Sequence, residues 1–246
     1  MIGANTRLVG LIGWPVAHSL SPRMHNAAFA ARGLDWAYVA LPVDPAEERL
    51  LDAVRGLAAA GFAGANVTAP YKRDVLDACD ELEDSVSESR SANTLLFRDG
   101  RVGASSTDAA VLEEIEAATA AVVGDGGAGQ AFASALSARG TEVRVFSRGG
   151  EWPPQTADAD LLVHATPIVD SRIAEPRPGQ IVVDLPYRSD GRPTALAAAA
   201  RAAGCLVLDG LEVLVRQGAA SFQVWTGTSA PIAVMRAALR SYASSQ

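Results

Sequence analysis

The chain has 246 residues, enough for two small domains, and its 49% hydrophobic and 20% charged residues are ordinary for a soluble globular protein. Its formal net charge of −7 argues against a general nucleic-acid binder, because neutralising phosphates needs a surplus of lysine and arginine. No apolar run reaches the ~20 residues of a membrane helix, no segment has the pattern of a secretory signal, and two cysteines suggest no disulfide framework, so we expect a cytoplasmic protein without membrane partners.

Predicted strands and helices alternate in the first part of the chain. Strands are expected at residues 7–12, 37–42 and 62–67, and helices at 21–30 and 45–60. Ser21-Pro22 suits a helix start, since serine caps helices and proline fits the first turn. This alternation predicts a parallel, doubly wound sheet. A helical segment at 73–78 and a hairpin around Asp99-Gly100 are expected next.

The remaining chain predicts a second unit of the same class. A helix at 107–120 precedes strands at 121–124, 142–146, 161–164, 181–185 and 205–208, with helices at 130–139 and 194–203 between them. Residues 210–241 are expected to be mostly helical, with a break at 226–231. We therefore predict an α/β protein of two domains. The first would span residues 1–104, completed by helices at about 220–246, and the second would span residues 105–219.

A glycine-rich segment lies where the second unit changes from strand to helix. Residues 124–129 read Gly-Asp-Gly-Gly-Ala-Gly and fit the G-x-G-x-x-G pattern in the context that it needs. Such glycines let backbone N–H groups approach a pyrophosphate, and the helix N-terminus adds a partial positive charge. The same pattern also fits a turn that binds no ligand. As a dinucleotide site, its contacts would be Gly124, Gly126, Gly127, Ala128 and Gly129.

The end of the following strand distinguishes the two nicotinamide cofactors. An acidic residue there binds the ribose of NAD, whereas an arginine accommodates the 2′-phosphate of NADP. Here the strand runs into Ser147-Arg148, and no acidic residue occurs before Glu151. This favours NADP, with NAD as the alternative, although a single arginine is also common as a solvated loop charge.

The segment after Arg148 is short. Only fifteen residues separate Arg148 from His164, and they include Pro153-Pro154, which opposes helix formation. A strand-to-strand crossover through a helix takes at least about 10–12 residues. One strand–helix unit is therefore predicted to be trimmed, and we expect a smaller cofactor domain with weak dinucleotide binding.

Three polar clusters interrupt apolar strand ends, at residues 18–22, at 66–72, and at 93–94 together with 107–108. Each alone fits capping and turn chemistry. Together they place hydroxyls, amides, a lysine and an aspartate at the ends of successive elements, where open α/β sheets bind ligands. His18 is expected to be a structural residue buried beside the serines.

These clusters resemble the signature segments of the shikimate dehydrogenase family. Residues 13–22 resemble its G-x-P-x-x-H-S-x-S-P opening, and residues 64–72 resemble its G-x-N-V-T-x-P-[HY]-K segment. Asn93-Thr94-Leu95 and Thr107-Asp108 follow in the family's order, as do 183–187, 209–211, 217–218 and 225–227. The likeness spans nearly the whole chain, and the collinear set is more specific than any one segment.

The resemblance makes the first predicted domain an N-terminal α/β substrate domain and the second a Rossmann-type NAD(P)-binding domain. It implies reversible reduction of 3-dehydroshikimate to shikimate with NADPH, a step of aromatic amino-acid biosynthesis. It makes Lys72 and Asp108 the catalytic pair, because a positioned lysine can protonate the oxygen of a ketone that accepts hydride. The implied partner is a small hydroxy acid, with no metal, on a monomer or homodimer. The substrate residues implied are Ser19, Ser21, Asn66, Thr68, Asn93, Tyr187 and Gln217, and the further cofactor residues are Ser147, Arg148, Thr166 and Gly210.

The sequence departs from the family pattern near the expected nicotinamide loop. His164-Ala165-Thr166-Pro167 stands where the family has N-A-T-P, and Val169-Asp170 replaces a Gly-Met pair. Three alternatives therefore stand beside the dehydrogenase: an enzyme for quinate or an aminoshikimate, a non-catalytic shikimate-sensing or regulatory homologue, and a dehydrogenase for an unrelated polar acid.

Overall fold

The structure, a computed structural model, describes residues 2–188 and 190–243, with side chains as far as Arg240. Contacts divide the chain into two compact units. Unit 1 comprises Met1–Thr107 and Val215–Ser241, and unit 2 is built on Asp108–Leu214. The sequence predicted boundaries after residues 104 and 219. The observed division places Gln217 in unit 1, whereas the sequence analysis had it in the cofactor domain.

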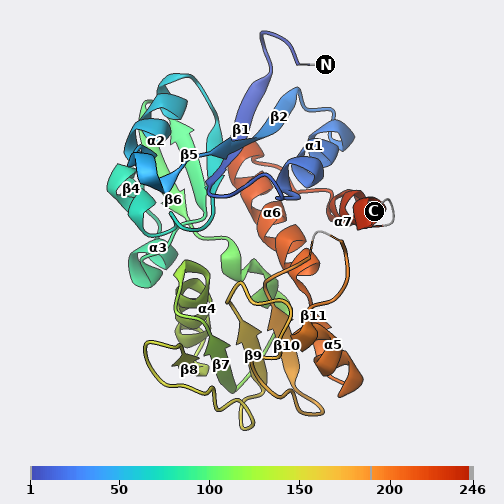
Figure 1. The fold of residues 1–246 in the computed structure, drawn as a ribbon. Coiled ribbons are helices and arrows are strands. Elements are labelled where there is room, and N and C mark those ends of the chain that lie inside the picture. Colours follow the sequence, from blue (N-terminus) through green and yellow to red (C-terminus); the bar gives the residue numbers. More distant parts are fainter. Residues whose placement is uncertain (1, 189, 244–246) are drawn as a thin grey trace. The chain divides into compact units, whose positions relative to one another are not determined.

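Unit 1 is built on a six-stranded sheet with the order β2-β1-β3-β5-β6-β4 (Figure 1). Its first three strands, β1 (Arg7–Gly13), β2 (Trp36–Pro42) and β3 (Gly64–Val67), are parallel, as predicted. The remaining strands include the hairpin predicted around Asp99-Gly100, which is confirmed. β5 (Thr94–Arg98) and β6 (Arg101–Ser105) are antiparallel because Asp99 and Gly100, at φ 52° and 76°, turn the chain straight back. The short strand β4 (Glu81–Leu82) was not predicted.

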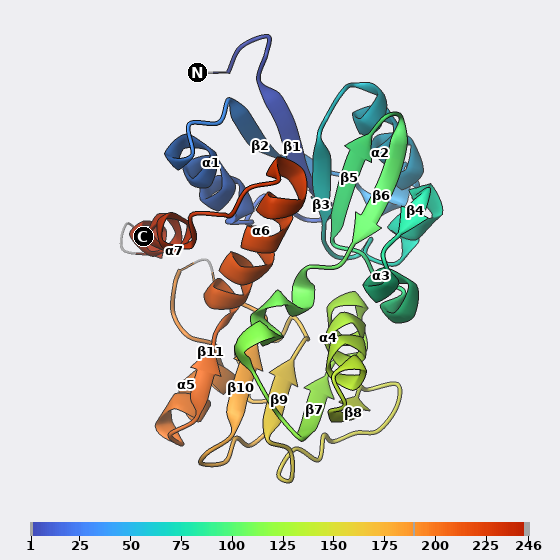
Figure 2. The same ribbon diagram turned by 180° about the vertical axis from the view of Figure 1, so that it is seen from behind.

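Helices cover both faces of this sheet (Figure 2). Neighbouring residues of a strand point to opposite faces. Ala65 packs with Leu50 and Val54 of α2 (Leu50–Ala59), whereas Gly64 faces Trp225 of α6 (Gly210–Thr226). The remaining helices of unit 1 are α1 (Ser21–Ala31), α3 (Asp84–Ser89) and α7 (Ile232–Ala243), with the 3₁₀ turns η1 (Pro45–Glu47) and η2 (Asp74–Ala78).

One helix of unit 1 begins later than predicted, and another has a different N-cap residue. The helix predicted at 45–60 is broken after η1, because Glu48 adopts the left-handed conformation at φ 51°. The first helix does begin at Ser21, but its N-cap position is Leu20, which makes no side-chain capping hydrogen bond. The break predicted at 226–231 is confirmed, since α6 ends at Thr226 and α7 begins at Ile232.

Unit 2 contains a parallel five-stranded sheet with the order β11-β10-β9-β7-β8. Its strands are β7 (Thr119–Val123), β8 (Glu142–Phe146), β9 (Leu161–His164), β10 (Ile181–Asp184) and β11 (Leu206–Leu208), and its α-helices α4 (Gly127–Ala138) and α5 (Ala195–Ala202) accompany the start of α6. The predicted Rossmann-type unit is confirmed. The strand order reverses at β7, between β8 and β9, so the crevice beyond the carboxyl ends of β7 and β9 is where such sheets bind ligands.

The entry to unit 2 corrects one prediction, and a later loop confirms another. A 3₁₀ helix, η3 (Asp108–Glu114), replaces the α-helix predicted at 107–120. The guanidinium group of Arg139 donates to the carbonyl oxygens of Leu112 (2.5 Å) and Ile115 (2.9 Å), which a continuing helix would have used internally. No helix or strand is assigned within the described residues 147–160, as expected from Pro153-Pro154.

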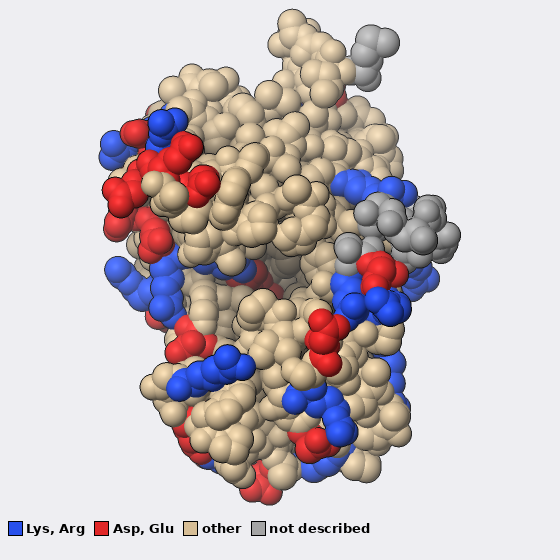
Figure 3. All heavy atoms as spheres, in the orientation of Figure 1, with Lys and Arg blue, Asp and Glu red and all other residues tan. Residues whose placement is uncertain are grey.

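Acidic side chains gather on one part of the unit 1 surface, near α2 and β4 in the upper left of Figure 3. The segment from η2 to the start of α3 contributes six exposed carboxylates: Asp74, Asp77, Asp80, Glu81, Glu83 and Asp84. An anionic ligand would be repelled there. A site for a hydroxy acid is therefore better sought at the ends of β1 and β3. No helix within the described chain is long and apolar enough to cross a membrane.

Candidate active site

The predicted polar clusters of unit 1 meet at one edge of its sheet. The N–H of Thr68 donates to the carbonyl oxygen of Ile12 (2.9 Å), which joins the ends of β1 and β3. Because β5 runs antiparallel to β3, its first residue Thr94 lies opposite Asn66 in the register. Ser105, the last residue of β6, lies opposite Thr94 in turn. The clusters at 66–72 and 93–94 are thus brought to the carboxyl end of β3, and Thr107 of the third cluster follows β6 there.

Asn66 is the centre of a buried hydrogen-bond network at this edge. Its side chain is 4% exposed, and its Nδ2 donates to the carbonyl oxygen of Asn93 and to Ser221 Oγ, both at 2.9 Å. Its Oδ1 accepts from the hydroxyl of Tyr38 at 2.9 Å. Protein groups therefore hold both ends of the Asn66 amide.

Asn93 links this network to Thr107 and Gln217. Its Oδ1 accepts from the N–H of Thr107 (2.7 Å), while its Nδ2 donates to Thr107 Oγ1 (3.0 Å) and to Gln217 Oε1 (3.3 Å). Gln217, on the part of α6 that belongs to unit 1, thereby contacts Asn93, which lies 124 positions earlier in the chain. The structure brings Asn66, Asn93 and Gln217 together within one unit.

Two residues of this network were missed from the sequence. Ser221 is fully buried; its Oγ lies 2.9 Å from Thr94 Oγ1 and 3.1 Å from Thr107 Oγ1, and it donates to the carbonyl oxygen of Gln217. Residues four apart share a helix face, so the spacing from Gln217 could have indicated Ser221. Tyr38 carried no such signal, since a tyrosine in an apolar strand reads as core.

The serines and Thr68 lie at the ends of β1 and β3 but outside this network. The N–H of Ser21 donates to Ser19 Oγ at 3.3 Å, and Ser21 is buried while Ser19 is half-buried. Thr68 packs its methyl group against Gly13, where an added Cβ would lie 2.3 Å from Thr68 Cγ2.

The histidine prediction was wrong. His18 is exposed, because the loop after β1 carries it outward, and the buried histidine of this region is His25 on α1. The His25 ring stacks on Tyr38 at 4.5 Å and 3°. Neither ring nitrogen has a hydrogen-bond partner among the described residues. Complete burial lowers the pKa of His25 to about 3, so its imidazole is neutral at physiological pH.

His25 should make the fold sensitive to acid. Because its folded pKa of about 3 lies below the ordinary 6.5, the unfolded chain binds the extra proton first. The stability that its neutral form confers is fully present above pH 6.5 and is lost as the pH falls toward 3. His25→Phe should therefore lose less of its free energy of unfolding between pH 7 and pH 4 than wild type, by about 3 kcal/mol. Urea titrations across this range measure the difference.

The control for this experiment is Phe29→Leu, which alters the same aromatic cluster without removing a titratable group. That variant should be less stable at every pH but keep the wild-type dependence on acid. Identical pH dependence in His25→Phe and wild type would show that His25 is not responsible.

Lys72 is the only lysine among the 21 lysine and arginine residues of the chain. It is half-buried, and its carbonyl oxygen accepts from the N–H of Ala92 at 2.8 Å, which ties its segment to the one that carries Asn93. Arginine does not release its proton in proteins, whereas lysine does. A lysine among arginines thus provides the one cationic side chain suited to proton transfer. Asp108, 7% exposed, begins unit 2.

The glycine-rich loop of unit 2 has the geometry of a phosphate cradle. Gly124, at φ 118°, would bring an added Cβ to 2.7 Å from the carbonyl oxygen of Ala165, and a Cβ on Gly129 would lie 1.9 Å from the carbonyl oxygen of Gly124. A Cβ on Gly126 would meet nothing. Helix α4 then begins at Gly127 with no side-chain cap, which leaves its first N–H groups for a ligand. The loop fits a pyrophosphate.

The predicted contacts after β8 and around β10 lie in unit 2. Arg148 is exposed and Ser147 half-buried, and the nearest acidic residue, Glu151, is paired with Arg144 at 2.6 Å. A Cβ on Gly210 would lie 2.4 Å from the carbonyl oxygen of Pro186, so only glycine fits the start of α6.

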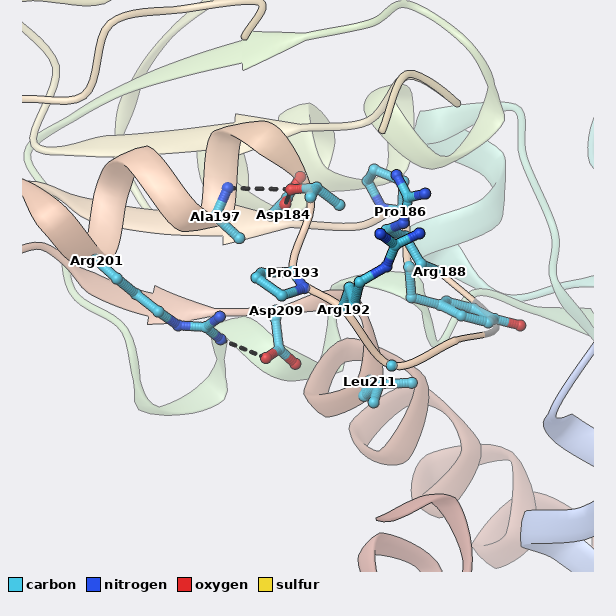
Figure 4. A pocket seen from close by; sticks show the side chains of 13 residues that line it. Asp184, Pro186, Arg188, Arg192, Pro193, Ala197, Arg201, Asp209 and Leu211 are labelled. Carbon is cyan, nitrogen blue, oxygen red and sulfur yellow. Dashed lines mark hydrogen bonds and ion pairs between the residues drawn. The ribbon is translucent and has the colours of Figure 1, made fainter. Parts of the chain in front are cut away.

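Tyr187 lines a small cavity of about 40 Å³ next to the start of α5 (Figure 4). Three arginines surround it, and one of them, Arg201, is paired with Asp209 at 2.6 Å. A cavity of this volume has room for a few water molecules but not for a substrate ring. Within the described chain, no three His, Cys, Asp or Glu side chains are grouped to hold a metal ion.

Known proteins match the chain along nearly its whole length. The family model for the shikimate dehydrogenase substrate binding domain matches residues 11–95, and that for the shikimate 5′-dehydrogenase C-terminal domain matches residues 210–240. The shikimate dehydrogenase (NADP(+)) of Anaeromyxobacter dehalogenans strain 2CP-1 is 40% identical over an alignment of 277 positions, which covers 97% of this chain and 98% of the relative.

Solved structures agree with these matches. A shikimate dehydrogenase in complex with NADP+ superposes with a TM-score of 0.87 at 30% identity, covering 98% of this chain and 97% of that one. The shikimate 5-dehydrogenase of Thermus thermophilus, in complex with NADP(H) and shikimate, gives 0.83 at 31% identity, covering 96% and 100%. The identity and coverage leave one conclusion: the chain belongs to the shikimate dehydrogenase family.

Proposed function

We propose that this chain is an NADP-dependent shikimate dehydrogenase, which reversibly reduces 3-dehydroshikimate to shikimate in aromatic amino-acid biosynthesis. The observation that carries the proposal is the hydrogen-bond network of Asn66, Asn93 and Gln217 at the carboxyl end of β3 in unit 1. It concentrates amide donors and acceptors where a polyhydroxylated ring needs them. Relatives that share 40% of the sequence bear the name of this NADP(+) enzyme.

The substrate roles follow from side-chain chemistry. Ser19 and Ser21 would hold the carboxylate, since they lie at the N-terminus of α1, where the helix dipole favours an anion. Thr68, Asn93 and Gln217 would bind the ring hydroxyls. Asn66, already held by Tyr38 and Ser221, would orient Asn93 and offer its remaining Oδ1 lone pair. Tyr187 would contribute a hydroxyl from unit 2.

Lys72 and Asp108 would form the catalytic pair. When bound, NADPH supplies the hydride that adds to the carbonyl carbon of the substrate. The Lys72 ammonium then gives a proton to the developing oxyanion, becomes a neutral amine and regains a proton from solvent. The Asp108 carboxylate would favour the charged ammonium and fix its direction.

The cofactor would be held by unit 2. The backbone of Gly124, Gly126, Gly127, Ala128 and Gly129 would bind the pyrophosphate, and Ser147 with Arg148 would bind the 2′-phosphate of the adenosine ribose. Thr166 and Gly210 would line the rest of the crevice. Pairing of Glu151 with Arg144 keeps the nearest carboxylate from repelling that phosphate.

Arg148 should decide between the two dinucleotides. Arg148→Ala should weaken NADP(H) binding by roughly 10–100-fold, the value of one or two charge-assisted hydrogen bonds, and leave NAD(H) binding nearly unchanged. Calorimetric titration of each cofactor measures this. Arg172→Ala, which removes an exposed arginine paired with Glu175 elsewhere in unit 2, is the control and should change neither affinity. Equal losses for both cofactors would remove Arg148 from 2′-phosphate recognition.

One set of assays tests the proposed function. NADPH oxidation with 3-dehydroshikimate is compared with NADP+ and NAD+ reduction by shikimate and by quinate. Fastest turnover with the shikimate pair and NADP(H) supports the proposal, and faster turnover with quinate would replace its substrate. Shikimate binding without turnover of any pair would favour the sensor.

We propose further that the enzyme works in the cytoplasm as a monomer or homodimer, with its small-molecule substrate and without a nucleic-acid or membrane partner. Light scattering after size-exclusion chromatography, at several protein concentrations, distinguishes the two assembly states.

A further inference from the structure

Unit 2 contains four hydrogen-bonded polar side chains, three buried and one half-buried, at the carboxyl ends of β9 and β10. His164 and Asp184 are the last residues of these strands, lie opposite each other in the register, and are completely buried. His164 Nδ1 lies 2.6 Å from Asp184 Oδ1, and His164 Nε2 lies 2.5 Å from Thr166 Oγ1. Thr194, the N-cap of α5, donates its hydroxyl to Asp184 Oδ2 and accepts from the N–H of Ala197 at 3.0 Å.

The hydrogen positions in this chain follow from its ends. Thr194 accepts from α5, so its single hydroxyl proton goes to Asp184. The carboxylate of Asp184 can only accept, and therefore His164 Nδ1 carries a proton and donates it. With that one proton on the ring, Nε2 is the acceptor and takes the hydroxyl proton of Thr166. Thr166 is left with its oxygen lone pairs, one of which faces the N–H of Ile168 at 3.4 Å.

Thr166, the last side chain of this hydrogen-bonded row, lies against the glycine-rich loop. An added Cβ on Gly124 would lie 3.2 Å from Thr166 Cγ2 and 2.7 Å from the carbonyl oxygen of Ala165. The N–H of Ala165 donates to the carbonyl oxygen of Val123 at 2.8 Å, which ties the ends of β7 and β9 together. These two strands flank the switch point of the sheet. Thr166 is half-buried there.

We propose that His164 is a positioning residue for the dinucleotide. Held by Asp184 and, through Thr194, by the start of α5, it fixes the Thr166 hydroxyl as a hydrogen-bond acceptor beside the glycine-rich loop. The matching ligand group is a donor, such as a ribose hydroxyl or a carboxamide N–H. This inference rests on the proposed function, because it assumes that a nicotinamide dinucleotide occupies that crevice.

Nitrogen-15 NMR of the imidazoles tests the hydrogen-bond chain without any cofactor. The chain has three histidines, and the His164 signals are identified by their loss in His164→Asn. We expect His164 Nδ1 to be protonated and Nε2 to be the acceptor. Thr166→Val should shift the Nε2 signal and leave Nδ1 protonated. A proton on Nε2 instead of Nδ1 would overturn the inference.

Calorimetric titration with NADP+ tests whether the hydrogen bond between His164 and Thr166 contributes to cofactor affinity. His164→Asn keeps an amide N–H for Asp184 and loses the contact with Thr166, while Thr166→Val loses the hydroxyl. Each should weaken NADP+ binding about tenfold, and the double variant should bind no worse than either, because both remove the same interaction. Thr166→Ser should restore binding. Shikimate affinity should stay at the wild-type value in all of them.

Thr141→Val is the matched control. It removes a threonine hydroxyl that donates to Ala117 at the opposite end of the same sheet, and NADP+ affinity should not change. Additive losses in the double variant, or wild-type affinity in His164→Asn, would overturn the positioning role and leave the proposed function standing. Wild-type protein that binds neither dinucleotide would overturn both.

Discussion

Lys72→Ala should lower kcat by about 10²–10⁴-fold and change the KM for shikimate far less. That is the range for loss of a general acid, whose contribution belongs to the transition state. Steady-state rates in both directions, with NADPH and 3-dehydroshikimate and with NADP+ and shikimate, measure the effect. A nearly normal kcat would exclude Lys72 from proton transfer.

Two variants separate proton transfer from charge and folding. Lys72→Arg keeps the positive charge but cannot release its proton, so its kcat should fall as in Lys72→Ala. Arg73→Ala removes the neighbouring exposed cation and should keep the wild-type kcat. Recovery of kcat in Lys72→Arg would mean that Lys72 acts through its charge alone.

Gly129→Ala should weaken NADP(H) binding about 100-fold, because the new Cβ would lie 1.9 Å from the carbonyl oxygen of Gly124. The loop has to move to relieve this contact, and overpacking of this kind typically costs about 1–3 kcal/mol. Shikimate binding by unit 1 should persist. Calorimetric titrations of both ligands measure the two affinities. Unchanged cofactor affinity would show that the loop does not hold the dinucleotide.

Gly126→Ala is the informative partner of that variant. Its Cβ would meet no protein atom, so the Tm should stay at the wild-type value while cofactor affinity still falls, since the methyl group occupies the space of the ligand. Gly56→Ala, in an exposed turn of α2, is the control and should raise stability by up to about 1 kcal/mol with both affinities unchanged.

Elements with a strong local pattern were predictable. The short apolar runs at β1, β7, β9 and β10 are typical of buried strands, and each forms one. The G-x-G-x-x-G segment predicts a strand-to-helix turn because side chains at Gly124 and Gly129 would collide with the backbone. The hairpin around Asp99-Gly100 is also local, because two residues at positive φ turn the chain back. In each case the residues that fix the structure are neighbours in sequence.

Elements that depend on distant partners were not predictable. The segment 107–120 has helical composition, but Arg139 captures its carbonyl oxygens from α4. The exchange of His18 for His25 as the buried histidine depends on Tyr38 and Trp225, which lie on other elements. Ser221 and Tyr38 belong to the site network because they contact Asn66. Ser221 lies 155 positions from Asn66 in the sequence, and Tyr38 lies 28 positions from it.

The single lysine gives this protein an unusual spectroscopic advantage. Lysine labelled with nitrogen-15 at Nζ would place one labelled amine in the whole chain, at Lys72. Its titration could then be followed in the intact protein, with and without shikimate, and with no resonance overlap. Amine-directed acylation would likewise report on that side chain and the chain terminus alone. The proposed proton donor can therefore be observed directly, rather than inferred from what its removal destroys.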